Sequence, residues 1–323
     1  MTLTTLTKPV LAAVGAAALA LGLTACSTAA ADGAADGTVT IGTLRGQPHL
    51  FTPYFYEDFA PEGVEFEIVL FDTSSDIKNA IVSGSVDFGV TGAASVITGV
   101  SQQQDVTIVA SSADGGTRIV ASPEIETPDD LVGAKVGYPM GATQEILLKE
   151  TLESLGIDPA EDVELVNLPF AEMAGAYGSG QIDAFISAEV GPSIAMQEDA
   201  HELTSPYETG IGRTNIVLAT KASLAEEDPD LVQEVVDTHA QATEYLAEHT
   251  DEWADRMVEE FAVDRPVVET AIENTWPRWE IDADYEATLQ AMNDEMVAFD
   301  QVSDAADAGA LTDTTFVDAV DVP

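Results

Sequence analysis

Two patterns of apolar residues alternate through the first two-thirds of the chain: short continuous runs, and residues spaced three or four positions apart. Runs such as Val39–Leu44 and Asp87–Thr91 are β-branched and bounded by glycine, proline or polar residues, which predicts buried strands. Between them, apolar residues recur every three or four positions, as in Ser75–Val82, which predicts helices with one buried face. Strands are expected at 39–44, 65–71, 87–91, 106–110, 135–139, 163–168, 183–187 and 215–220, and helices at 49–60, 75–82, 94–103, 143–155, 171–178 and 192–199. Strand alternating with helix is typical of a parallel α/β sheet.

The same strand–helix unit occurs twice. Ser83–Asp87 matches Ser179–Asp183, and Ile41–Gly46 matches Val136–Gly141 at nearly the same separation. We therefore expect two similar lobes. Everything beyond Leu224 carries helix spacing and must pack on something, so we expect it to return to the first lobe. The expected division is residues 38–122 with 221–323 as lobe 1 and 123–220 as lobe 2, with crossings near Ser122 and Thr220.

The composition and net charge of the chain disfavour several classes of partner and site. The chain has 58 Asp and Glu against 11 Lys and Arg, a net charge of -47, which disfavours nucleic acid and anionic lipid as partners. Hydrophobic residues make up 46% of the sequence, which is enough for a packed core. A single cysteine excludes an internal disulfide, a cysteine-rich zinc site and a cysteine-ligated iron–sulfur cluster.

The N-terminal segment has the pattern of an export signal. The apolar run Val10–Leu23 is short and rich in alanine, which fits a signal-peptide core at residues 1–25. It ends in Leu23-Thr24-Ala25-Cys26, which resembles the lipobox of bacterial lipoproteins. We expect Cys26 to carry the lipid that anchors the protein outside the cytoplasm, with residues 26–37 as a flexible tether. The alternative is a chance cysteine after a signal cleaved elsewhere.

The whole pattern resembles the ABC-transporter substrate-binding proteins, in their nitrate/sulfonate/taurine branch, whose fold also occurs in thiamine-pyrimidine binding and synthesis. The segments that carry the resemblance are Ile41-Gly42, Pro48–Leu50, Asn79–Gly89, Gly133–Gly137, Gly180–Ala184 and Trp276–Trp279. The resemblance implies an α/β fold with two lobes of the periplasmic-binding-protein type (type II), built from parallel or mixed sheets with flanking helices. It also implies a monomer that serves an ABC permease and ATPase.

A ligand is expected beyond the carboxyl ends of the strands. In the first lobe these ends place Arg45, Gly46, Gln47, Gly92, Ala93, Ala94, Ser111 and Ser112 at the site, and in the second lobe Met140, Gly141, Ala142, Thr143, Ser187 and Glu189. Three of these segments begin helices, so free N–H groups and positive dipole ends favour an anionic head group. Thr143 is either a ligand contact or a helix N-cap.

Charged and aromatic residues leave alternatives open. Arg45 is either a bidentate clamp for a sulfonate or carboxylate, or a solvated side chain; Arg118 and Arg213 either contact the ligand or form interlobe salt bridges. His49 either caps a helix or contacts the ligand. The repeated Asp87 and Asp183 favour capping or turn roles. The runner-up ligand, a pyrimidine precursor, predicts aromatic stacking from Tyr138 or Phe55.

The sequence supports an enzyme less well than it supports a binding protein. The sequence has no Gly-x-Ser-x-Gly, His-Glu-x-x-His or P-loop motif, and no cysteine follows Cys26 to supply the cysteine-rich motif of the pyrimidine synthases. We expect no catalytic residue, metal or cofactor. A lipid-anchored enzyme remains the alternative to a transport receptor for a small anion.

Overall fold

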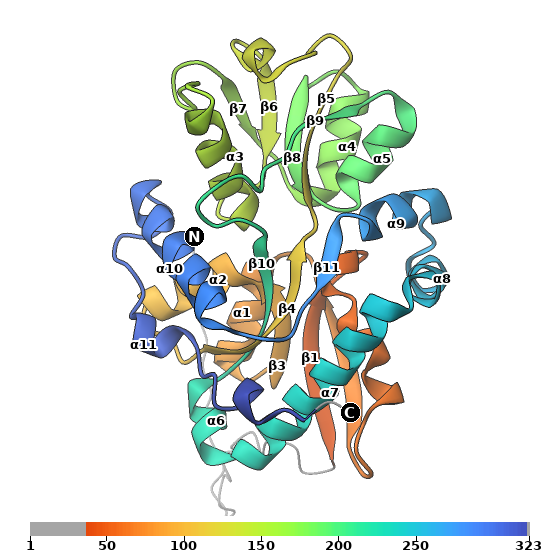
Figure 1. Ribbon diagram of the computed structural model, residues 1–323, viewed down its shortest axis with the longest axis vertical. Helices are drawn as coiled ribbons and strands as arrows, with labels where there is room; N and C mark the ends of the chain where they lie inside the picture. The colour runs from red at the N-terminus through yellow and green to blue at the C-terminus, as the bar shows by residue number, and fades with distance from the viewer. Residues whose placement is uncertain (1–36, 322–323) are drawn as a thin grey trace, which may run out of the picture. The chain divides into compact units, whose positions relative to one another are not determined.

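Two mixed β-sheets form the framework of the computed structural model, which describes residues 37–321 (Figure 1). The first sheet has the strand order β11-β4-β10-β3-β1-β2 and the second the order β7-β6-β8-β5-β9. The first sheet comprises β1 (Thr38–Leu44), β2 (Glu65–Phe71), β3 (Phe88–Gly92), β4 (Thr107–Gly115), β10 (Thr214–Thr220) and β11 (Thr275–Pro277). The second comprises β5 (Thr117–Ala121), β6 (Lys135–Tyr138), β7 (Glu164–Asn167), β8 (Ala184–Ala188) and β9 (His201–Thr204). We call the two sheets with their helices lobe 1 and lobe 2.

The two sheets share one topology. In each, three parallel strands (β2-β1-β3 and β7-β6-β8) are followed by one antiparallel strand that arrives from the other lobe, β10 or β5. A further strand, β4 or β9, then pairs antiparallel with it. The two similar lobes expected from the repeated sequence unit are therefore confirmed, although each sheet is mixed because of the exchanged strand.

The repeated residues play the same structural part in both lobes. Asp87 accepts a hydrogen bond from the N–H of Thr40 at 2.9 Å, and Asp183 accepts one from the N–H of Lys135 at 2.8 Å. Each carboxylate thus ties the start of one strand to the chain entering its neighbour. These hydrogen bonds span 47 and 48 residues, so the two aspartates connect neighbouring strands and do not have the expected capping or turn role.

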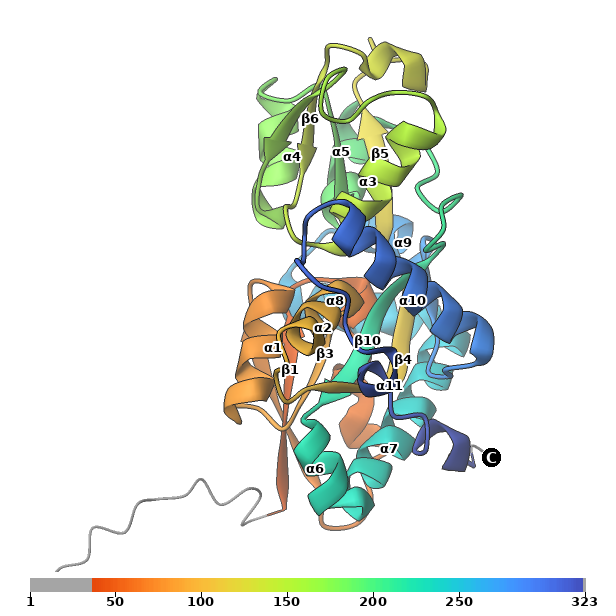
Figure 2. The same ribbon diagram turned by 90° about the vertical axis from the view of Figure 1, so that its left-hand side faces the viewer.

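Helices cover both faces of each sheet. The α-helices are α1 (Ser74–Ser83), α2 (Ala93–Ser101), α3 (Thr143–Ser154), α4 (Phe170–Gly178), α5 (Gly191–Glu198), α6 (Ala222–Glu227), α7 (Pro229–Glu248), α8 (Thr250–Phe261), α9 (Arg265–Ile272), α10 (Ala283–Ala298) and α11 (Ala308–Leu311). The 3-10 helices are η1 (Pro48–Leu50), η2 (Thr52–Asp58), η3 (Pro128–Leu131) and η4 (Val317–Ala319). Helices α1 and α2 pack on one face of the first sheet and η2 with α7 on the other (Figure 2). In lobe 2, α3 packs on one side of β8, and α4 and α5 on the other.

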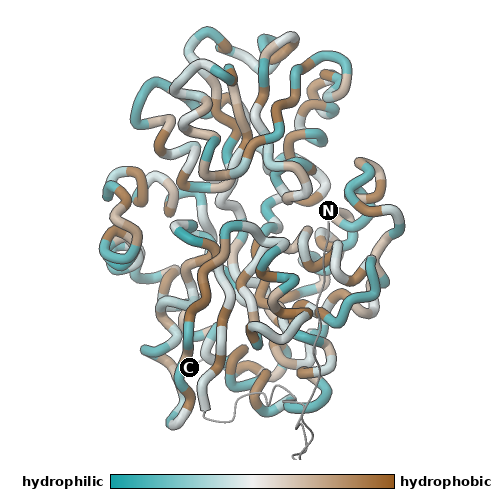
Figure 3. Tube along the Cα trace, turned by 180° about the vertical axis from the view of Figure 1, so that it is seen from behind, coloured by the Kyte–Doolittle hydropathy of each residue, from teal (hydrophilic) through white to brown (hydrophobic). Residues whose placement is uncertain are grey.

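Apolar side chains collect where these layers meet. Strands β1, β3, β4 and β10 of the first sheet are mostly buried along their length, and Figure 3 shows hydrophobic residues along the strands. Gly42 and Gly137, at matching places of the repeat, have no room for a side chain. A Cβ at Gly42 would lie 3.1 Å from Ile77, and one at Gly137 would lie 2.7 Å from Ile182. Both glycines let the neighbouring apolar side chains pack directly on the strand.

The chain passes between the sheets at two places that differ from the expectation. It leaves the first sheet at Gly115 and enters the second at Thr117, and it returns between Thr204 and Thr214. Residues 117–121, which fall within the expected lobe 1, therefore form β5 of the second sheet, and β10, expected in lobe 2, belongs to the first. The difference arises because strand patterns show where a strand lies and not which sheet it joins. We accordingly propose lobe boundaries at Gly116 and within residues 205–213.

Two expected helical regions also differ. The segment 49–60 forms η1 and η2 with i→i+3 hydrogen bonds, because Pro53 lacks the N–H that an α-helix needs. The region beyond Leu224 contains strand β11, so Trp276 belongs to the edge of the first sheet and not to a helix.

No helix within residues 37–321 is long and apolar enough to cross a bilayer. The signal peptide, Cys26 and nearly all of the tether lie outside the described residues.

Candidate ligand-binding cavity

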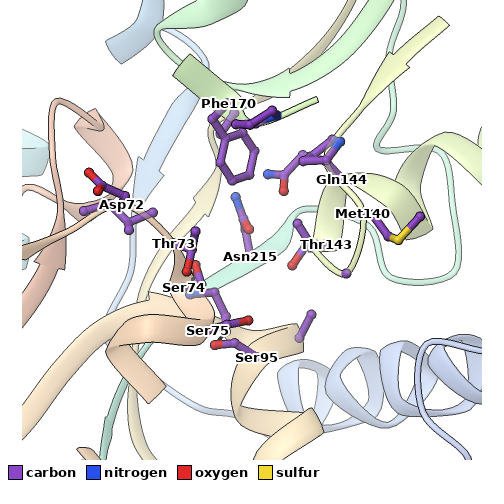
Figure 4. Close-up of a pocket in the computed structure, with 18 of the residues that line it drawn as sticks. Asp72, Thr73, Ser74, Ser75, Ser95, Met140, Thr143, Gln144, Phe170 and Asn215 are labelled. Carbon is purple, nitrogen blue, oxygen red and sulfur yellow. Dashed lines mark hydrogen bonds between the residues drawn. The ribbon is translucent and has the colours of Figure 1, made fainter. Parts of the chain in front are cut away.

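A cavity of about 240 Å³ lies at the carboxyl ends of the parallel strands of both sheets (Figure 4). Lobe 1 contributes residues that follow β2 and β3, and lobe 2 contributes residues that follow β6 and β7. The lining residues are Leu44, His49, Leu50, Asp72, Thr73, Ser74, Ser75, Gly92, Ala94, Ser95, Pro139, Met140, Gly141, Ala142, Thr143, Gln144, Asn167, Leu168, Pro169, Phe170, Ala188, Asn215 and Ile216. This is the position that the strand-end rule predicts for a ligand.

Four helices begin at this cavity. Its lining includes Ser74 and Ser75 of α1, Ala94 of α2, Thr143 of α3 and Phe170 of α4, all within the first two residues of their helices. The first N–H groups of a helix have no intrahelical acceptor, and the helix dipole adds partial positive charge there. Four such starts around one space favour a bound anion without requiring a basic side chain.

Buried polar side chains complete the wall. Thr143 is only 2% exposed and its hydroxyl has no hydrogen-bond partner among residues 37–321. Helix α3 has Ala142 as its N-cap, without a side-chain cap bond, so Thr143 is the first helical residue and its expected alternative role as N-cap is wrong. The hydroxyl is thereby left available to a ligand.

Two amide side chains hold the wall in place. Asn215 of β10 donates from Nδ2 to the carbonyl of Gly115 at 2.6 Å, and Gln144 of α3 donates from Nε2 to Oγ1 of Thr117 at 2.9 Å. Figure 4 shows both side chains beside the ring of Phe170. The residues that set the sheet crossing therefore also shape the cavity.

His49 is buried in the cavity wall. Burial lowers the pKa of His49 to about 3, so the imidazole is neutral at physiological pH. Its Nδ1 has no hydrogen-bond partner in the described part of the chain. The ring lies directly against Gly116, where a Cβ would come within 2.6 Å of it. His49 can offer a hydrogen bond to a ligand but no charge.

A second cavity, of about 440 Å³, adjoins the first. The two share Leu44, Asp72, Thr73, Pro169, Phe170 and Ala188. Arg45, Gly46 and Gln47 line this second cavity and not the first. Within the described residues, the first cavity is lined by no lysine or arginine, and Asp72 is its only acidic residue.

The structure brings together seven of the fifteen expected site residues in the first cavity. These are His49, Gly92, Ala94, Met140, Gly141, Ala142 and Thr143. Ala93, Ser111, Ser112, Ser187 and Glu189 line neither cavity. Ser111 and Ser112 lie in mid-strand because β4 continues to Gly115, five residues beyond its expected end. Ala188, the last residue of β8, lines both cavities. Ser187 and Glu189, on either side of it, point the other way because side chains alternate along a strand.

The other charged residues named from the sequence have structural partners. Glu189 is fully buried and accepts hydrogen bonds from Arg118 Nε at 2.6 Å and from the Ser193 hydroxyl at 2.6 Å. Arg118 also donates from Nη2 to the carbonyl of Thr270 on α9, so it joins the second sheet to a helix of lobe 1. Arg213 stacks on Trp276 with its guanidinium carbon 3.9 Å from the ring centroid. Arg118 therefore forms ion pairs within lobe 2, with Glu189 and Glu202, and reaches lobe 1 only through the carbonyl of Thr270, so the expected interlobe salt bridge is wrong for its ion-pair partners.

Two segments of the cavity wall were not expected from the sequence. These are Asp72–Ser75, which follow β2, and Asn167–Phe170, which begin at the last residue of β7. Both strands were expected, so applying the strand-end rule to them would have found the segments. Asn215 was not expected at the site either, and the signal for it was an amide at the start of a largely apolar strand. Phe55 and Tyr138 line neither cavity, so the aromatic wall is Phe170 and not the expected pair.

The described residues contain no group of three or more His, Cys, Asp or Glu side chains placed to hold a metal ion.

Comparison with known structures identifies the fold as that of the periplasmic binding proteins. The periplasmic aliphatic sulphonate binding protein of Escherichia coli superposes with a TM-score of 0.76 at 19% identity, covering 87% of this chain and 99% of that one. The Candida albicans CA3427 product, described as having the generic periplasmic binding protein fold, superposes with a TM-score of 0.63 at 13% identity, covering 84% of this chain and 92% of that one. The expected two-lobed α/β fold is confirmed.

The chain belongs to the NMT1/THI5-like family, whose model matches residues 56–253. It is 29% identical over 189 residues to the taurine-binding periplasmic protein of Escherichia coli, covering 57% of this chain and 58% of that protein. It is 26% identical over 201 residues to the formylaminopyrimidine-binding protein of Halalkalibacterium halodurans, covering 60% of each. The matched part thus spans about three-fifths of the length of these relatives, both of which are named as binding proteins and not as enzymes.

Proposed function

We propose that this protein is the extracytoplasmic solute-binding component of an ABC importer and that it captures a small organic anion of the sulfonate class. The observation that carries the proposal is the convergence of four helix N-termini on one cavity between the lobes. The names of the relatives, which bind taurine, an aliphatic sulphonate or a formylaminopyrimidine, support a small solute. A non-enzymatic role follows, in which the ligand leaves unchanged.

The cavity can select an anion although the protein is strongly negative. The net charge of -47 opposes the approach of any anion, so attraction must come from donors close to the ligand. Backbone N–H groups at the starts of α1, α2, α3 and α4 provide such donors, and the hydroxyl of Thr143 adds one that has no other partner in residues 37–321. Hydrogen bonds to a charged acceptor contribute roughly 1.5–3 kcal/mol each.

The ligand contacts that we propose follow from this arrangement. The head group is held by the segments Gly92–Ser95, Gly141–Gln144 and Thr73–Ser75, with His49 as a neutral donor or acceptor in the wall. Arg45, Gly46 and Gln47 are proposed to act from the adjoining cavity. Delivery to a permease and ATPase, a monomeric state and the lipid anchor on Cys26 belong to the same proposal.

Thr143→Val tests the proposed site. The substitution keeps the shape of the side chain and removes one hydrogen bond to the anion, so methanesulfonate should bind about tenfold to a hundredfold more weakly in isothermal titration. Thr151→Val is the matched control, because Thr151 is also buried on α3 with a hydroxyl that has no partner in the described residues, but it lies outside both cavities. Equal affinities of the two variants would reject the site.

A pyrimidine precursor is the second candidate ligand, supported by the formylaminopyrimidine-binding relative and by the Phe170 ring in the wall. Mass spectrometry of small molecules released from the denatured protein separates the two. A sulfonate supports the first candidate, and an intact aminopyrimidine replaces it with the second. A chemically converted molecule would indicate an enzyme.

A further inference from the structure

Helix α3 of lobe 2 packs against the C-terminal end of α10 of lobe 1 (Figure 2). We call this the α3–α10 contact; it is formed by residues 145–153 of lobe 2 and residues 294–301 of lobe 1. Gln301 donates from Nε2 to Oε2 of Glu145 at 2.8 Å, and Nζ of Lys149 lies 5.2 Å from the centroid of the Phe299 ring. A hydrogen bond and a cation–π contact thus join the two lobes beside the cavities.

Glu145 connects this contact to the cavity wall. Its side chain is buried, and the oxygen that accepts from Gln301 also accepts from the N–H of Gly141 at 2.7 Å. Its other oxygen pairs with Lys149 at 2.7 Å. Gly141 lines the first cavity, so a shift of Gln301 relative to Glu145 is passed directly to the loop that begins α3.

Like charges oppose each other farther along the same contact. Glu150 and Glu153 lie on α3, and Glu295 lies on α10. None of these three carboxylates has a lysine or arginine partner within 4.0 Å among residues 37–321. Lys149 is the only basic residue of the two helices, and it is already paired with Glu145. The α3–α10 contact therefore contains a repulsive part beside the attractive one.

Glu150 also touches the segment that carries the chain between the lobes. A Cβ added at Gly210, within residues 205–213, would lie 3.3 Å from Oε1 of Glu150. Oε2 of Glu150 is buried and has no hydrogen-bond partner in the described part of the chain. The repulsive part of the contact thus lies directly against one of the two crossings.

The environment of Glu150 and Glu295 favours their neutral forms. Burial raises the pKa of Glu150 and the charge of Glu295 raises it further, while hydrogen bonds from the uncharged crossing segment offset this in part. Burial likewise raises the pKa of Glu295, and the charges of Glu153 and Asp294 add to the effect.

The direction of the coupling follows from these shifts. Moving α3 away from α10 returns both carboxyls to water, so protonation favours the packed arrangement and ionisation opposes it. The packed arrangement is most stable below the ordinary glutamate pKa of 4.5 and loses stability as the pH rises through the raised values. Salt acts in the same direction as acid, because it screens the repulsion between the ionised carboxylates.

We propose that the α3–α10 contact is an interlobe latch that acid and salt tighten, and that neutral pH at low ionic strength loosens. Its attractive part is the bond of Gln301 to Glu145, and its repulsive part is the opposition of Glu150 to Glu295. The latch is a property of the ligand-free protein. It goes beyond the proposed function and does not depend on it.

Single-molecule energy transfer between one dye on each lobe measures the latch without any ligand. Ala160 of lobe 2 and Ala305 of lobe 1 are exposed, and both are replaced by cysteine in the full chain carrying Cys26→Ser, which removes the only native cysteine. At low salt, the ratio of molecules with short to long dye separation should be about fivefold higher at pH 4 than at pH 8. Adding 1 M salt at pH 8 should also raise the ratio. Circular dichroism checks that the fold is kept in each condition.

Glu295→Gln tests the repulsive part, because it removes the charge and keeps the shape of a half-buried side chain. At pH 8 and low salt it should raise the ratio about fivefold and remove most of the pH dependence. Glu150→Gln should do the same from the other lobe. Glu286→Gln is the matched control: it changes the net charge equally on an exposed residue of α10, more than two turns from Glu295, and should behave like the parent protein.

Gln301→Ala tests the attractive part and should lower the ratio at both pH values. An unchanged dye separation between pH 4 and pH 8 in the parent protein would overturn the latch. Equal responses of Glu295→Gln and Glu286→Gln would assign the effect to net charge and reject the α3–α10 contact as its source. Because no ligand is present, neither result bears on anion binding, and a failure of anion binding would leave the latch unaffected.

Discussion

Arg45 is an exposed arginine without an ion-pair partner within 4.0 Å among residues 37–321, in a chain with 58 acids. The sequence left two roles open for Arg45, a bidentate clamp for an anion and a solvated side chain. The structure places Arg45 in the second cavity, away from the four helix starts. An exposed charge contributes only about 0.2–1 kcal/mol, so we now predict that Arg45→Ala weakens methanesulfonate binding no more than about fivefold by calorimetry. Lys135→Ala, on an exposed residue of β6 outside both cavities, is the control; a tenfold loss specific to Arg45→Ala would restore the clamp.

Asp114, near the end of β4, is a half-buried acid whose ionisation works against the fold. Burial raises the pKa of Asp114 to about 6, and the nearby Arg278 and Arg213 offset this only in part. Below about pH 4 the carboxyl is protonated in both the folded and unfolded states, so it has no differential effect. As the pH rises from about 4 to 6, the unfolded chain ionises first and the fold loses stability.

Asp114→Asn should therefore stabilise the protein above about pH 6 and not below about pH 4. A two-unit difference in pKa corresponds to about 2–3 kcal/mol, which urea unfolding at pH 4 and pH 8 and constant ionic strength would measure. Asp304→Asn, on an exposed residue, controls for the change in net charge. An equal gain in both variants, or a gain for Asp114→Asn that persists at pH 4, would contradict the prediction.

At the scale of elements, the glycine pair between β4 and β5 makes the sheet crossing. Gly115 and Gly116 have positive φ of 79° and 69°. Their N–H groups donate to the carbonyls of Arg213 and Asn274 at 2.8 and 2.7 Å, and the carbonyl of Gly116 accepts from Glu189 at 2.9 Å. The pair is thus bonded to segments of both lobes, and the ring of His49 fills the space that a side chain would need.

Gly116→Ala should destabilise the protein by roughly 2–5 kcal/mol, through the left-handed conformation and through the clash with His49. Gly180→Ala is a matched control, because Gly180 also has a positive φ of 70° but nothing lies within 4 Å of its would-be Cβ. That control should lose only about 1–2 kcal/mol. Thermal or urea unfolding measures both; similar losses in the two variants would show that the contact with His49 is unimportant.

The elements show which parts of the fold could be predicted from the sequence. The repeated segments Ser83–Asp87 and Ser179–Asp183 revealed two similar lobes because the same strand–helix unit occurs twice in the sequence. The strands β5, β9 and β11 were not predicted, since they are short and lie at crossings or edges, where pairing partners come from distant parts of the chain.

The same difference between local and distant contacts explains why only some of the site residues could be predicted. Helix starts such as Gly141–Thr143 are local features, whereas the pairing of Glu189 with Arg118 depends on β5 lying beside β8.

At the scale of the whole molecule, attachment to the membrane rests on the N-terminal segment outside the described residues. Because Cys26 follows the apolar run Val10–Leu23 in a lipobox-like sequence, we predict that Cys26→Ser releases the protein from the membrane fraction into the medium. Acyl chains contribute about 0.8 kcal/mol per buried methylene, so losing them removes the anchor. Ser27→Ala keeps the cysteine and should stay with the membrane. Immunoblots of the membrane fraction and the medium measure where each variant is found. Retention of Cys26→Ser in the membrane fraction would reject lipidation.

The two crossings also predict how the molecule moves. Within residues 37–321, only the residues near Gly116 and within 205–213 carry the chain between the sheets. Rotation at these two places can bring the lobes together around a ligand, on the microsecond-to-millisecond scale of domain motions. We predict a smaller radius of gyration by small-angle X-ray scattering when the best-binding sulfonate is saturating. Thr143→Val, at a ligand concentration that saturates only the wild type, should keep the ligand-free radius. An unchanged wild-type radius, with saturation confirmed by calorimetry, would mean that the lobes do not close on the ligand, and the cavity would then have to bind through the preformed helix starts alone.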